Sequence, residues 1–449
     1  MNTLNTPGGY YACPEIKYER GLNMKMKKQY SFPFLMAFVL LIFTVQSEAV
    51  VNVQCPGDIN GDAVPDPCLY GIQGGNGPNA GECKSGPGNT PGENPEYNPD
   101  VECLHLTGGD GFITMADGRP QYIFSFADVT GVPEADVMTH GMLAAAFPAP
   151  AMAVDEGKDF YLSLTNVGMV IRPDLFDPHT VHFHGFPQSS TVFDGLPESG
   201  IAINMGATLT YYYHLVEPGT YMYHCHVEAT EHMQMGMLGN LYVHAAQAGP
   251  LGTCGSGPCT QFAYNDGDGS TGYDVEYALQ LGGFDPDFHD ASWNVQPLPF
   301  AMMWDRYPMI NGRGYPDTIN PAPLTGPTEN GGIQSQLESS LITATAGEKV
   351  LLRLSNLNIT VAHTLISPSI PMEVVGIDAK QLRSTTGENL YYTTNSVTMG
   401  GGMSADVILD TSGIPAGEYY IYAANLQYLA NFDEDEPTGG MMTKIVINP

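Results

Sequence analysis

Two short segments of the chain concentrate side chains that bind transition metals. The first reads His-Thr-Val-His-Phe-His-Gly and places imidazoles at His179, His182 and His184; the second begins with His224-Cys225-His226 and continues to His232 and Met237. Alternate side chains of an extended strand share a face, so we expect His182 and His184 on one face and His179 on the other. By the same alternation, Cys225 points away from His224 and His226.

The donors divide into two sets with different chemistry. A thiolate, two imidazoles and a thioether form the ligand set of a blue-copper electron-transfer site, here Cys225, His179, His232 and Met237. The other imidazoles form a second cluster suited to copper that binds oxygen species: His182, His184, His224 and His226. Zinc is the main rival metal, but a Met ligand and same-face His pairs are not typical of zinc. Polar strand residues on a solvated face are the alternative to a metal site, which the density of donors disfavours.

These motifs resemble the copper-binding signatures of multicopper oxidases, within the cupredoxin superfamily that also holds laccases and copper nitrite reductases. The resemblance is close over about residues 140–245. A second region, through Ile310–Pro316, Val374–Asp378 and Met399–Leu409, looks like the copper-free middle domain of three-domain oxidases. The resemblance implies type 1 ligands at His179, Cys225, His232 and Met237, a type 2 ligand at His182, and type 3 ligands at His184, His224 and His226. It also implies that Cys225 connects the two sites, because both its neighbours bind the second one.

The chain departs from the family pattern in two ways. Five residues separate His226 from His232, where the common motif has three, so the loop should differ in shape. A full trinuclear site of the family uses eight imidazoles, and this chain supplies four of that kind. Residues 262–449 hold only His289 and His363, and we expect His363 to be a satisfied core residue. The second copper centre is therefore smaller than in the family, shared across an oligomer interface, or absent.

The elements that position these residues are expected to be β-strands. Residues 160–165 and 350–355 alternate in the manner of strands, and 52 Gly and 35 Pro punctuate the chain. The stretch from Val154 to Asn166 parallels that from Ala346 to Asn356, which indicates two copies of one fold. We expect an all-β protein with two cupredoxin-like Greek-key sandwiches. The expected boundaries are a copper-binding domain at 101–248, a linker at 249–262 and a second cupredoxin-like domain without a copper motif at 263–449.

The overall charge limits the partners. The chain carries 16 Lys and Arg against 48 Asp and Glu, a formal net charge of −32. Nucleic acid and anionic membrane surfaces repel such a polyanion. Small molecules, metal cations and basic proteins are the partners that remain.

The first 49 residues predict export. Three lysines between Lys25 and Lys28 precede an apolar run from Phe34 to Val45, and Ser47-Glu-Ala49 closes it as a signal-peptidase site would. That run is too short to span a bilayer comfortably, so we expect an extracytoplasmic protein without a membrane span. In an oxidising compartment, six cysteines predict three disulfides. Cys254 and Cys259 are expected to pair, and the other four allow three pairings: Cys55, Cys68, Cys83 and Cys103.

Residues 50–100 are rich in Gly, Pro, Asn and Asp, which predicts an irregular disulfide-tied segment. Inside it, oxygen side chains occupy relative positions 1, 3, 5 and 9 of a calcium loop: Asp58, Asn60, Asp62 and Asp66. Position 6 is Ala63 rather than Gly, and position 12 is Leu69 rather than an acid. An acidic surface turn is the alternative.

Three functions agree with these motifs. The favoured one is an exported copper oxidase that passes single electrons from a metal ion or a phenolic donor through type 1 copper to oxygen. The alternatives are a nitrite-reductase-like enzyme with type 1 and type 2 copper at a subunit interface, and a type 1 electron carrier without a second site. His182 and His226 favour the oxidase. Nitrite reductases typically carry Asp in place of the middle His of the first motif, which is His182 here, and they have no His directly after the Cys. The resemblance alone suggests a trimer.

Overall fold

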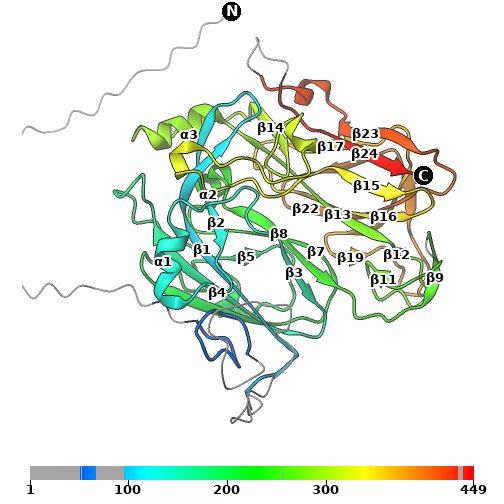
Figure 1. Cartoon of the computed structure of the whole chain (residues 1–449), viewed down its shortest axis with the longest axis horizontal. Coiled ribbons are helices and arrows are strands. Elements are labelled where there is room, and N and C mark those ends of the chain that lie inside the picture. The colour runs from blue at the N-terminus through cyan, green and yellow to red at the C-terminus, as the bar shows by residue number, and fades with distance from the viewer. Residues whose placement is uncertain (1–50, 52, 67–95, 256, 433–437) are drawn as a thin grey trace, which may run out of the picture. The chain divides into compact units, whose positions relative to one another are not determined.

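The computed structural model describes residues 51, 53–66, 96–255, 257–432 and 438–449 (Figure 1). Strands dominate this part of the chain, which confirms the expected all-β class. The predicted signal peptide and most of the predicted Cys-rich segment, including Cys68 and Cys83, lie outside the described residues.

The first sandwich packs two four-stranded sheets face to face. One sheet has the order β2, β1, β4, β6: Pro120–Asp128, Val101–Thr114, Asp159–Gly168 and Thr208–His214. The other has the order β3, β8, β7, β5: Met152–Asp155, Leu238–His244, Gly219–His224 and His182–Phe183. Apolar side chains such as Leu106, Phe160 and Leu241 form one buried cluster between the sheets, which stabilises the pair by removing apolar surface from water.

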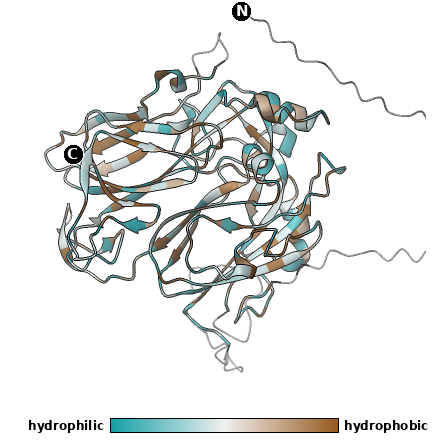
Figure 2. Cartoon of the chain, turned by 180° about the vertical axis from the view of Figure 1, so that it is seen from behind, coloured by the Kyte–Doolittle hydropathy of each residue, from teal (hydrophilic) through white to brown (hydrophobic). Residues whose placement is uncertain are grey.

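The second sandwich has the same plan with more strands. One sheet has the order β14, β13, β16, β22, β18, β19: Tyr307–Ile310, Val275–Phe284, Lys349–Asn356, Met403–Asp410, Met372–Ile377 and Lys380–Gln381, with β20 (Tyr392–Thr394) also paired to β18. The other has the order β15, β24, β23, β17, β21: Ile342–Thr345, Met442–Asn448, Gly417–Ala423, His363–Ile366 and Ser396–Met399. Hydrophobic residues, drawn in brown, occur along strands of both sandwiches (Figure 2).

The strand pairings confirm that one fold is repeated. In the first sandwich β4 runs parallel to β1 and antiparallel to β6; in the second, β16 runs parallel to β13 and antiparallel to β22. The last residue of each predicted repeat segment has the same role. Asn166 donates to the Ile203 carbonyl and accepts from the Gly168 amide, and Asn356 does the same with Met399 and Asn358.

The described residues contain three α-helices: α1 (Glu134–Gly141) lies against β1 and β4, and α2 (Ala229–Met235) and α3 (Pro286–Trp293) lie against β2. The same part of the chain has five 3-10 turns, η1 to η5: Thr191–Phe193, Phe300–Met302, Asp317–Ile319, Thr328–Asn330 and Leu426–Leu429. Helix α3 begins where the Asp285 carboxylate accepts a hydrogen bond from the Asp287 amide and Pro286 fills the first turn. It is held to β2 by His289, whose Nδ1 lies 2.5 Å from the Tyr122 carbonyl oxygen.

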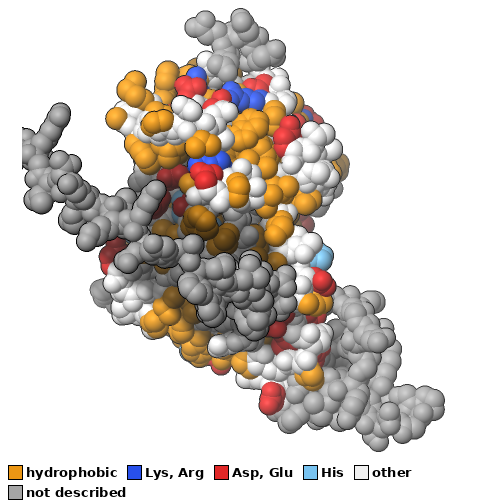
Figure 3. Space-filling model, turned by 90° about the vertical axis from the view of Figure 1, so that its left-hand side faces the viewer, with side chains coloured by type: hydrophobic (Ala, Val, Ile, Leu, Met, Phe, Trp, Pro, Cys, Tyr) orange, Lys and Arg blue, Asp and Glu red, His pale blue; other side chains and the backbone are white. Residues whose placement is uncertain are grey.

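Exposed apolar side chains gather at the end of α3 and in the segment after it. They belong to Trp293, Val295, Phe300, Met302 and Trp304. The side of the molecule seen in Figure 3 shows hydrophobic side chains interspersed with Asp and Glu.

The segment predicted as a linker is partly ordered into strands. Strands β9 (Leu251–Cys254) and β10 (Gly257–Cys259) form a hairpin, and β11 (Gln261–Phe262) pairs with β12 (Gly272–Tyr273). The predicted Cys254–Cys259 disulfide closes the hairpin, and a second disulfide joins Cys55 to Cys103 at the start of β1.

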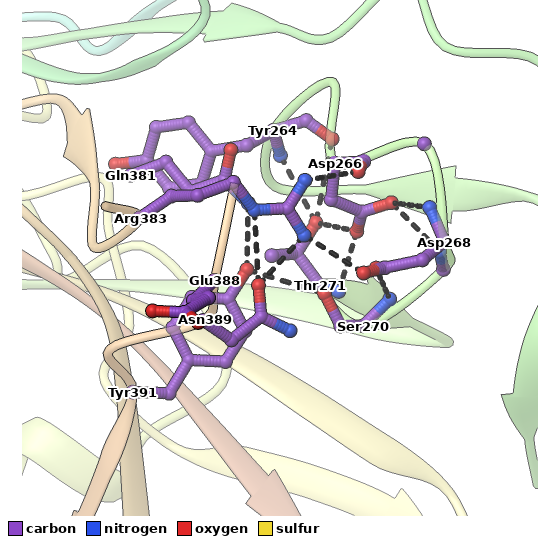
Figure 4. Close-up of polar contacts among 12 residues, drawn as sticks. Tyr264, Asp266, Asp268, Ser270, Thr271, Gln381, Arg383, Glu388, Asn389 and Tyr391 are labelled. Carbon is purple, nitrogen blue, oxygen red and sulfur yellow. Dashed lines mark hydrogen bonds and ion pairs between the residues drawn. The ribbon is translucent and has the colours of Figure 1, made fainter. Parts of the chain in front are cut away.

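Arg383 fixes the turn between β11 and β12 to the second sandwich (Figure 4). Its guanidinium donates to the Asp266 carbonyl and lies 2.8 Å from an Asp268 carboxylate oxygen. The Asp266 side chain in turn accepts hydrogen bonds from Gly269 and Thr271, which holds the turn in one conformation.

A buried polar network joins the two sandwiches. Asp406 of β22 accepts hydrogen bonds of 2.5 Å from the hydroxyls of Thr220 in β7 and of Tyr264. Arg353 of β16 lies 3.7 Å from Asp406 and donates to Glu276 at 2.7 Å. Arg353 and Asp406 are both almost fully buried, so each depends on the other groups of the network for its charge.

Candidate metal centre

The structure brings three of the four predicted type 1 ligands together in the first sandwich. Cys225 directly follows β7, His179 precedes β5, and His232 lies in α2. The Cys225 sulfur lies 3.2 Å from His232 Nδ1 and 3.9 Å from His179 Nδ1. All three side chains are fully buried, and their donor atoms lie within 4.8 Å of one another.

The electrostatics of this group favour a thiolate. Burial alone raises the pKa of the Cys225 thiol, but the adjacent His232 and His179 imidazoles lower that pKa well below its ordinary range. Burial alone lowers the pKa of His232, but Cys225 and Asp177 raise it above its ordinary value. The thiolate is the form of cysteine that binds metals, so this donor set fits copper in both residue type and protonation.

Met237 and a strand glycine complete the site. The Met237 side chain is fully buried, its amide donates to the His232 carbonyl, and its carbonyl accepts from the Cys225 amide. Gly108 of β1 lies against the two ligands. A Cβ atom at Gly108 would stand 2.8 Å from His179 Cδ2 and 3.5 Å from Met237 Cε. Gly108 is not among the predicted site residues; its only signal in the sequence is a Gly-Gly pair inside a predicted β region.

The four imidazoles of the second predicted cluster also meet. His184 Nε2 lies 2.9 Å from His224 Nε2, and the His182 ring centroid lies 5.1 Å from that of His226. Three of the residues, His182, His184 and His224, bring ligand atoms within 4.8 Å of one another. The Nδ1 atoms of His182 and His224 lie 2.6 and 2.8 Å from the backbone carbonyls of Asp194 and Cys225. These contacts orient the rings and leave the Nε2 atoms to face the cluster.

Burial keeps two of these rings neutral. It lowers the pKa of His224 to about 3, with a further contribution from His184, and it also lowers the pKa of His184. A neutral imidazole has a free lone pair for a metal, so the cluster is in the ligating form.

Two cavities adjoin the cluster, and His184 lines both. One, of about 480 Å³, lies between His224, His226 and the second-sandwich residues Asn358 and Thr360. The other, of about 350 Å³, is lined by His182, Asp378 and Ser404. Small molecules can therefore approach the imidazoles from two sides.

The second sandwich repeats the backbone arrangement of the predicted type 1 site but keeps only two of its four ligand types. In the first sandwich Cys225 N donates to Met237 O and Met237 N to His232 O; in the second, Ala423 N donates to Met441 O and Met441 N to Tyr428 O. His179 bridges to Ile203, and His363 pairs with Met399 in the same relation to Asn356. His363, Ala423, Tyr428 and Met441 thus correspond to His179, Cys225, His232 and Met237.

The same correspondence accounts for the missing imidazoles. His182 pairs with His224 across β5 and β7, and Ile366 pairs with Tyr422 across β17 and β23. By the same offsets, Pro368 and Ala424 occupy the positions of His184 and His226. The second sandwich therefore offers no imidazole at any of these four positions.

Neither of the two histidines in the second region lies in the cluster. His289 packs α3 on β2, as described above. His363 is buried beside Tyr428, with ring centroids 5.0 Å apart, but among the described residues neither ring nitrogen has a hydrogen-bond partner. The expectation of a satisfied core histidine was right about burial and wrong about its hydrogen bonds.

The predicted calcium loop forms a tight turn. Asp58 accepts hydrogen bonds from the amides of Gly61 and Ala63, and Asp66 accepts one from Ile59. Asn60 donates to the Asp62 carboxylate, and the loop contacts α1 through the amide of Glu134. Calcium at this turn stays a prediction.

Models of one protein family match both sandwiches. A model described as multicopper oxidase covers residues 129–248, and a second with the same description covers residues 302–446, together more than half of the chain. The chain belongs to the multicopper oxidase family. Members of this family are copper-dependent oxidoreductases, and copper is therefore the metal that the donor set described above is expected to hold.

Individual relatives are distant. Laccase-1 of Emericella nidulans is 32% identical over 115 residues, which are 25% of this chain and 17% of that protein. The solved structure of the Blue Copper Oxidase from Nitrosomonas europaea is 22% identical with a TM-score of 0.55, over 77% of this chain and 86% of that one. A copper nitrite reductase from Nitrosomonas europaea is 18% identical with a TM-score of 0.51, over 78% and 94%. These two likenesses show the fold alone.

Within the described residues, the helices are too short or too polar to cross a bilayer.

Proposed function

We propose that the chain is an exported copper-dependent oxidase that passes single electrons from a reducing substrate to oxygen. The observation that carries this proposal is the position of Cys225 between two clusters. Its sulfur lies among the predicted type 1 ligands, while its neighbours His224 and His226 belong to the second cluster. One residue thus joins an electron-accepting site to an imidazole site by a few covalent bonds.

Each predicted copper ligand has a role in the proposal. Copper held by Cys225, His179, His232 and Met237 would accept single electrons, and copper held by the second cluster would transfer them to oxygen. The chain itself fixes the thiolate between two imidazoles, keeps His224 neutral, and leaves cavities on both sides of His184 for a small acceptor.

Copper content tests the proposal. The copper-loaded chain should hold more than one copper per subunit, show type 1 and type 2 paramagnetic-resonance signals, and consume oxygen with a reducing donor. One copper per subunit with only a type 1 signal would instead indicate an electron carrier. In that case, replacing His182 and His226 together would leave electron transfer intact.

A second candidate, a nitrite-reductase-like enzyme, is supported by the three-imidazole group alone. His182, His184 and His224 can hold one copper without help from the second sandwich, whose equivalent positions hold no histidine. Nitrite turnover with no oxygen consumption would favour this candidate. His289 and His363 are poor choices for an additional donor, because both lie buried in apolar packing.

Export and assembly complete the proposal. Two disulfides in the described residues agree with an oxidising, extracytoplasmic location. A homo-oligomer, with a trimer suggested only by the family resemblance, is tested by light scattering.

A further inference from the structure

A series of aromatic rings leads from the predicted type 1 site toward the surface of the molecule. The His232 ring lies edge-on to Phe124 with the centroids 6.0 Å apart, and Phe124 lies edge-on to Tyr122 at 5.5 Å. The next two contacts, from Tyr122 to Phe112 and from Phe112 to Trp293, are both 5.3 Å. Each distance is ordinary for aromatic packing, but together these contacts join a buried imidazole to the last residue of α3.

The two ends of the series differ in exposure. His232 is fully buried, and the three rings that follow it are buried as well. Trp293, at the other end, is 39% exposed. Rings in contact therefore connect the predicted copper site with solvent, and no part of the chain has to move for an electron to pass between them.

Two members of the series can lose an electron, because tyrosine and tryptophan are oxidised far more readily than phenylalanine. Burial, together with the nearby Asp110 carboxylate, raises the pKa of Tyr122 above its ordinary value. Its phenol is therefore neutral and must release a proton when it is oxidised. The hydroxyl donates to Asp110 Oδ2 at 2.8 Å, and both residues are fully buried. Asp110 can accept that proton without the help of water.

The surrounding contacts fix this arrangement. The amides of Val170 and Ile171 donate to the two oxygens of Asp110, both at 2.8 Å, and hold the carboxylate toward the phenol. The contact of His289 with the Tyr122 carbonyl ties α3, which carries Trp293, to the strand that carries Tyr122. The electron-donating rings and the proton acceptor thus keep their positions relative to one another.

We propose that Tyr122 and Trp293 supply electrons to the predicted type 1 site when no reducing substrate does so, and thereby protect the protein from its own oxidising power. This inference rests on the proposed oxidase function, because oxygen reduction is what would leave the site short of electrons. Trp293 is the point at which an external reductant restores the series.

The steps balance in electrons and protons. Tyr122 gives one electron toward His232 and its phenolic proton to Asp110. Trp293 then gives one electron to the Tyr122 radical, and the proton returns from Asp110. An external thiolate gives one electron to the oxidised indole and becomes a thiyl radical, two of which combine to a disulfide. Without a thiolate, the indole loses its N–H proton to water and the resulting radical adds dioxygen, which marks Trp293 covalently.

This mark is the first test. The copper-loaded full chain is reduced, exposed to oxygen without further donor over repeated cycles, and mapped by mass spectrometry. Trp293 should gain oxygen, and Tyr122→Phe should lower this gain about tenfold or more. Trp304, the only other tryptophan of the chain, is 55% exposed and lies outside the series. A diffusing oxidant would reach Trp304 at least as readily, so equal oxidation of both residues would overturn the proposal.

A second measurement needs no oxygen chemistry. In the reduced, copper-loaded chain without oxygen, a flash-generated ruthenium(III) tris-bipyridine cation removes an electron at the surface, and blue absorption appears when the type 1 site has lost one. Trp293→Phe and Tyr122→Phe should each slow this appearance about tenfold or more, whereas Trp304→Phe should not. Equal rates in the wild type and these three variants would overturn the proposal.

The variants keep an aromatic ring at each position. Blue absorption of the oxidised variants equal to that of the wild type shows that slow transfer is not caused by a lost copper site. Oxygen consumption with Trp293 oxidation that is unchanged in Tyr122→Phe would overturn the proposal and leave the oxidase standing. Slower transfer in Trp293→Phe and Tyr122→Phe, without oxygen consumption from any donor, would confirm the electron route and overturn the proposed oxidase.

Discussion

At the scale of single residues, the predicted type 1 site needs a glycine at position 108, where there is no room for a larger side chain. Gly108 leaves room for His179 and Met237, and a methyl group there would overlap the His179 ring. We expect Gly108→Ala to displace His179, weaken the blue absorption of the copper-loaded protein and lower its copper content, with the overall fold retained. Visible spectroscopy, copper analysis and circular dichroism measure these three effects.

Gly282→Ala is the control for that substitution. Gly282 also lies in a strand, β13, but a Cβ atom there would meet only Phe147 Cζ at 3.6 Å, an ordinary contact. It should leave the blue absorption unchanged. If Gly108→Ala also leaves the absorption unchanged, the site does not need a glycine at this position.

The candidate ligands could be identified from the sequence because their residue types and spacing are typical of a copper site, whatever the fold. Gly108 and Asp177 could not. Gly108 reaches the site only because β1 packs across it, and Asp177 because the chain before His179 turns back toward α2. Such contacts are set by tertiary packing, which local spacing does not encode.

At the scale of elements, helix α3 makes stability depend on pH through His289. Burial lowers the pKa of His289 to about 4, so between about pH 6.5 and pH 4 the unfolded chain binds a proton there and the folded chain does not. Stability therefore falls as pH falls, by about 1.4 kcal/mol per pH unit from this residue alone. His289→Gln keeps a side-chain N–H donor and should make this pH dependence shallower by about that amount.

Denaturant unfolding of the copper-free protein at pH 7, 6 and 5 measures the effect. His140→Gln, an exposed residue in α1, is the control and should keep the wild-type pH dependence. Equal pH slopes for His289→Gln and the wild type would contradict the assignment.

The strand patterns were predicted more reliably than their surroundings. The alternation at 160–165 identified β4, but two of the three residues on the polar face it predicted, Ser163 and Thr165, are buried as well. Ser163 and Thr165 pair with the hydroxyls of Thr210 and Thr208 on β6, and the Gln54 amide also donates to Thr210. Alternation shows which face is polar, but it does not show whether another part of the chain covers that face.

At the scale of the whole molecule, the second sandwich has the same backbone arrangement as the predicted type 1 site. It differs at two of the four ligand positions, which are Ala423 and Tyr428. Replacing Ala423 with Cys and Tyr428 with His would restore the thiolate and the second imidazole beside His363 and Met441. In a Cys225→Ser background, which lacks the original site, we expect this double substitution to bring back blue absorption. It should not restore oxygen consumption, because Ile366 and Tyr422 stand where the first sandwich has His182 and His224.

Copper content and the visible spectrum check this prediction. The Cys225→Ser parent is the baseline, and Ala423→Cys alone should give a weaker signal because Tyr428 remains. A folded but colourless double variant would show that the backbone correspondence does not extend to ligand geometry.

One buried carboxylate, Asp406, is central to the polar contacts between the sandwiches. Asp406 is fully buried and accepts from Thr220 and Tyr264 beside the buried Arg353. Asp406→Asn should lower the free energy of unfolding by about 3–5 kcal/mol, because Arg353 would lose a buried counter-charge. Chemical denaturation measures this loss. Asp410→Asn, at the exposed end of the same strand, should change stability by less than about 0.5 kcal/mol.

Cys225 can also report on the opening of the first sandwich. In the described part of the chain the other cysteines form disulfides, and Cys225 is a free, fully buried thiol. In the copper-free protein an alkylating reagent can reach it only when the first sandwich opens. Mass spectrometry can follow the rate at which the peptide containing Cys225 gains the label. That rate therefore reports how often the first sandwich opens in the unmutated chain.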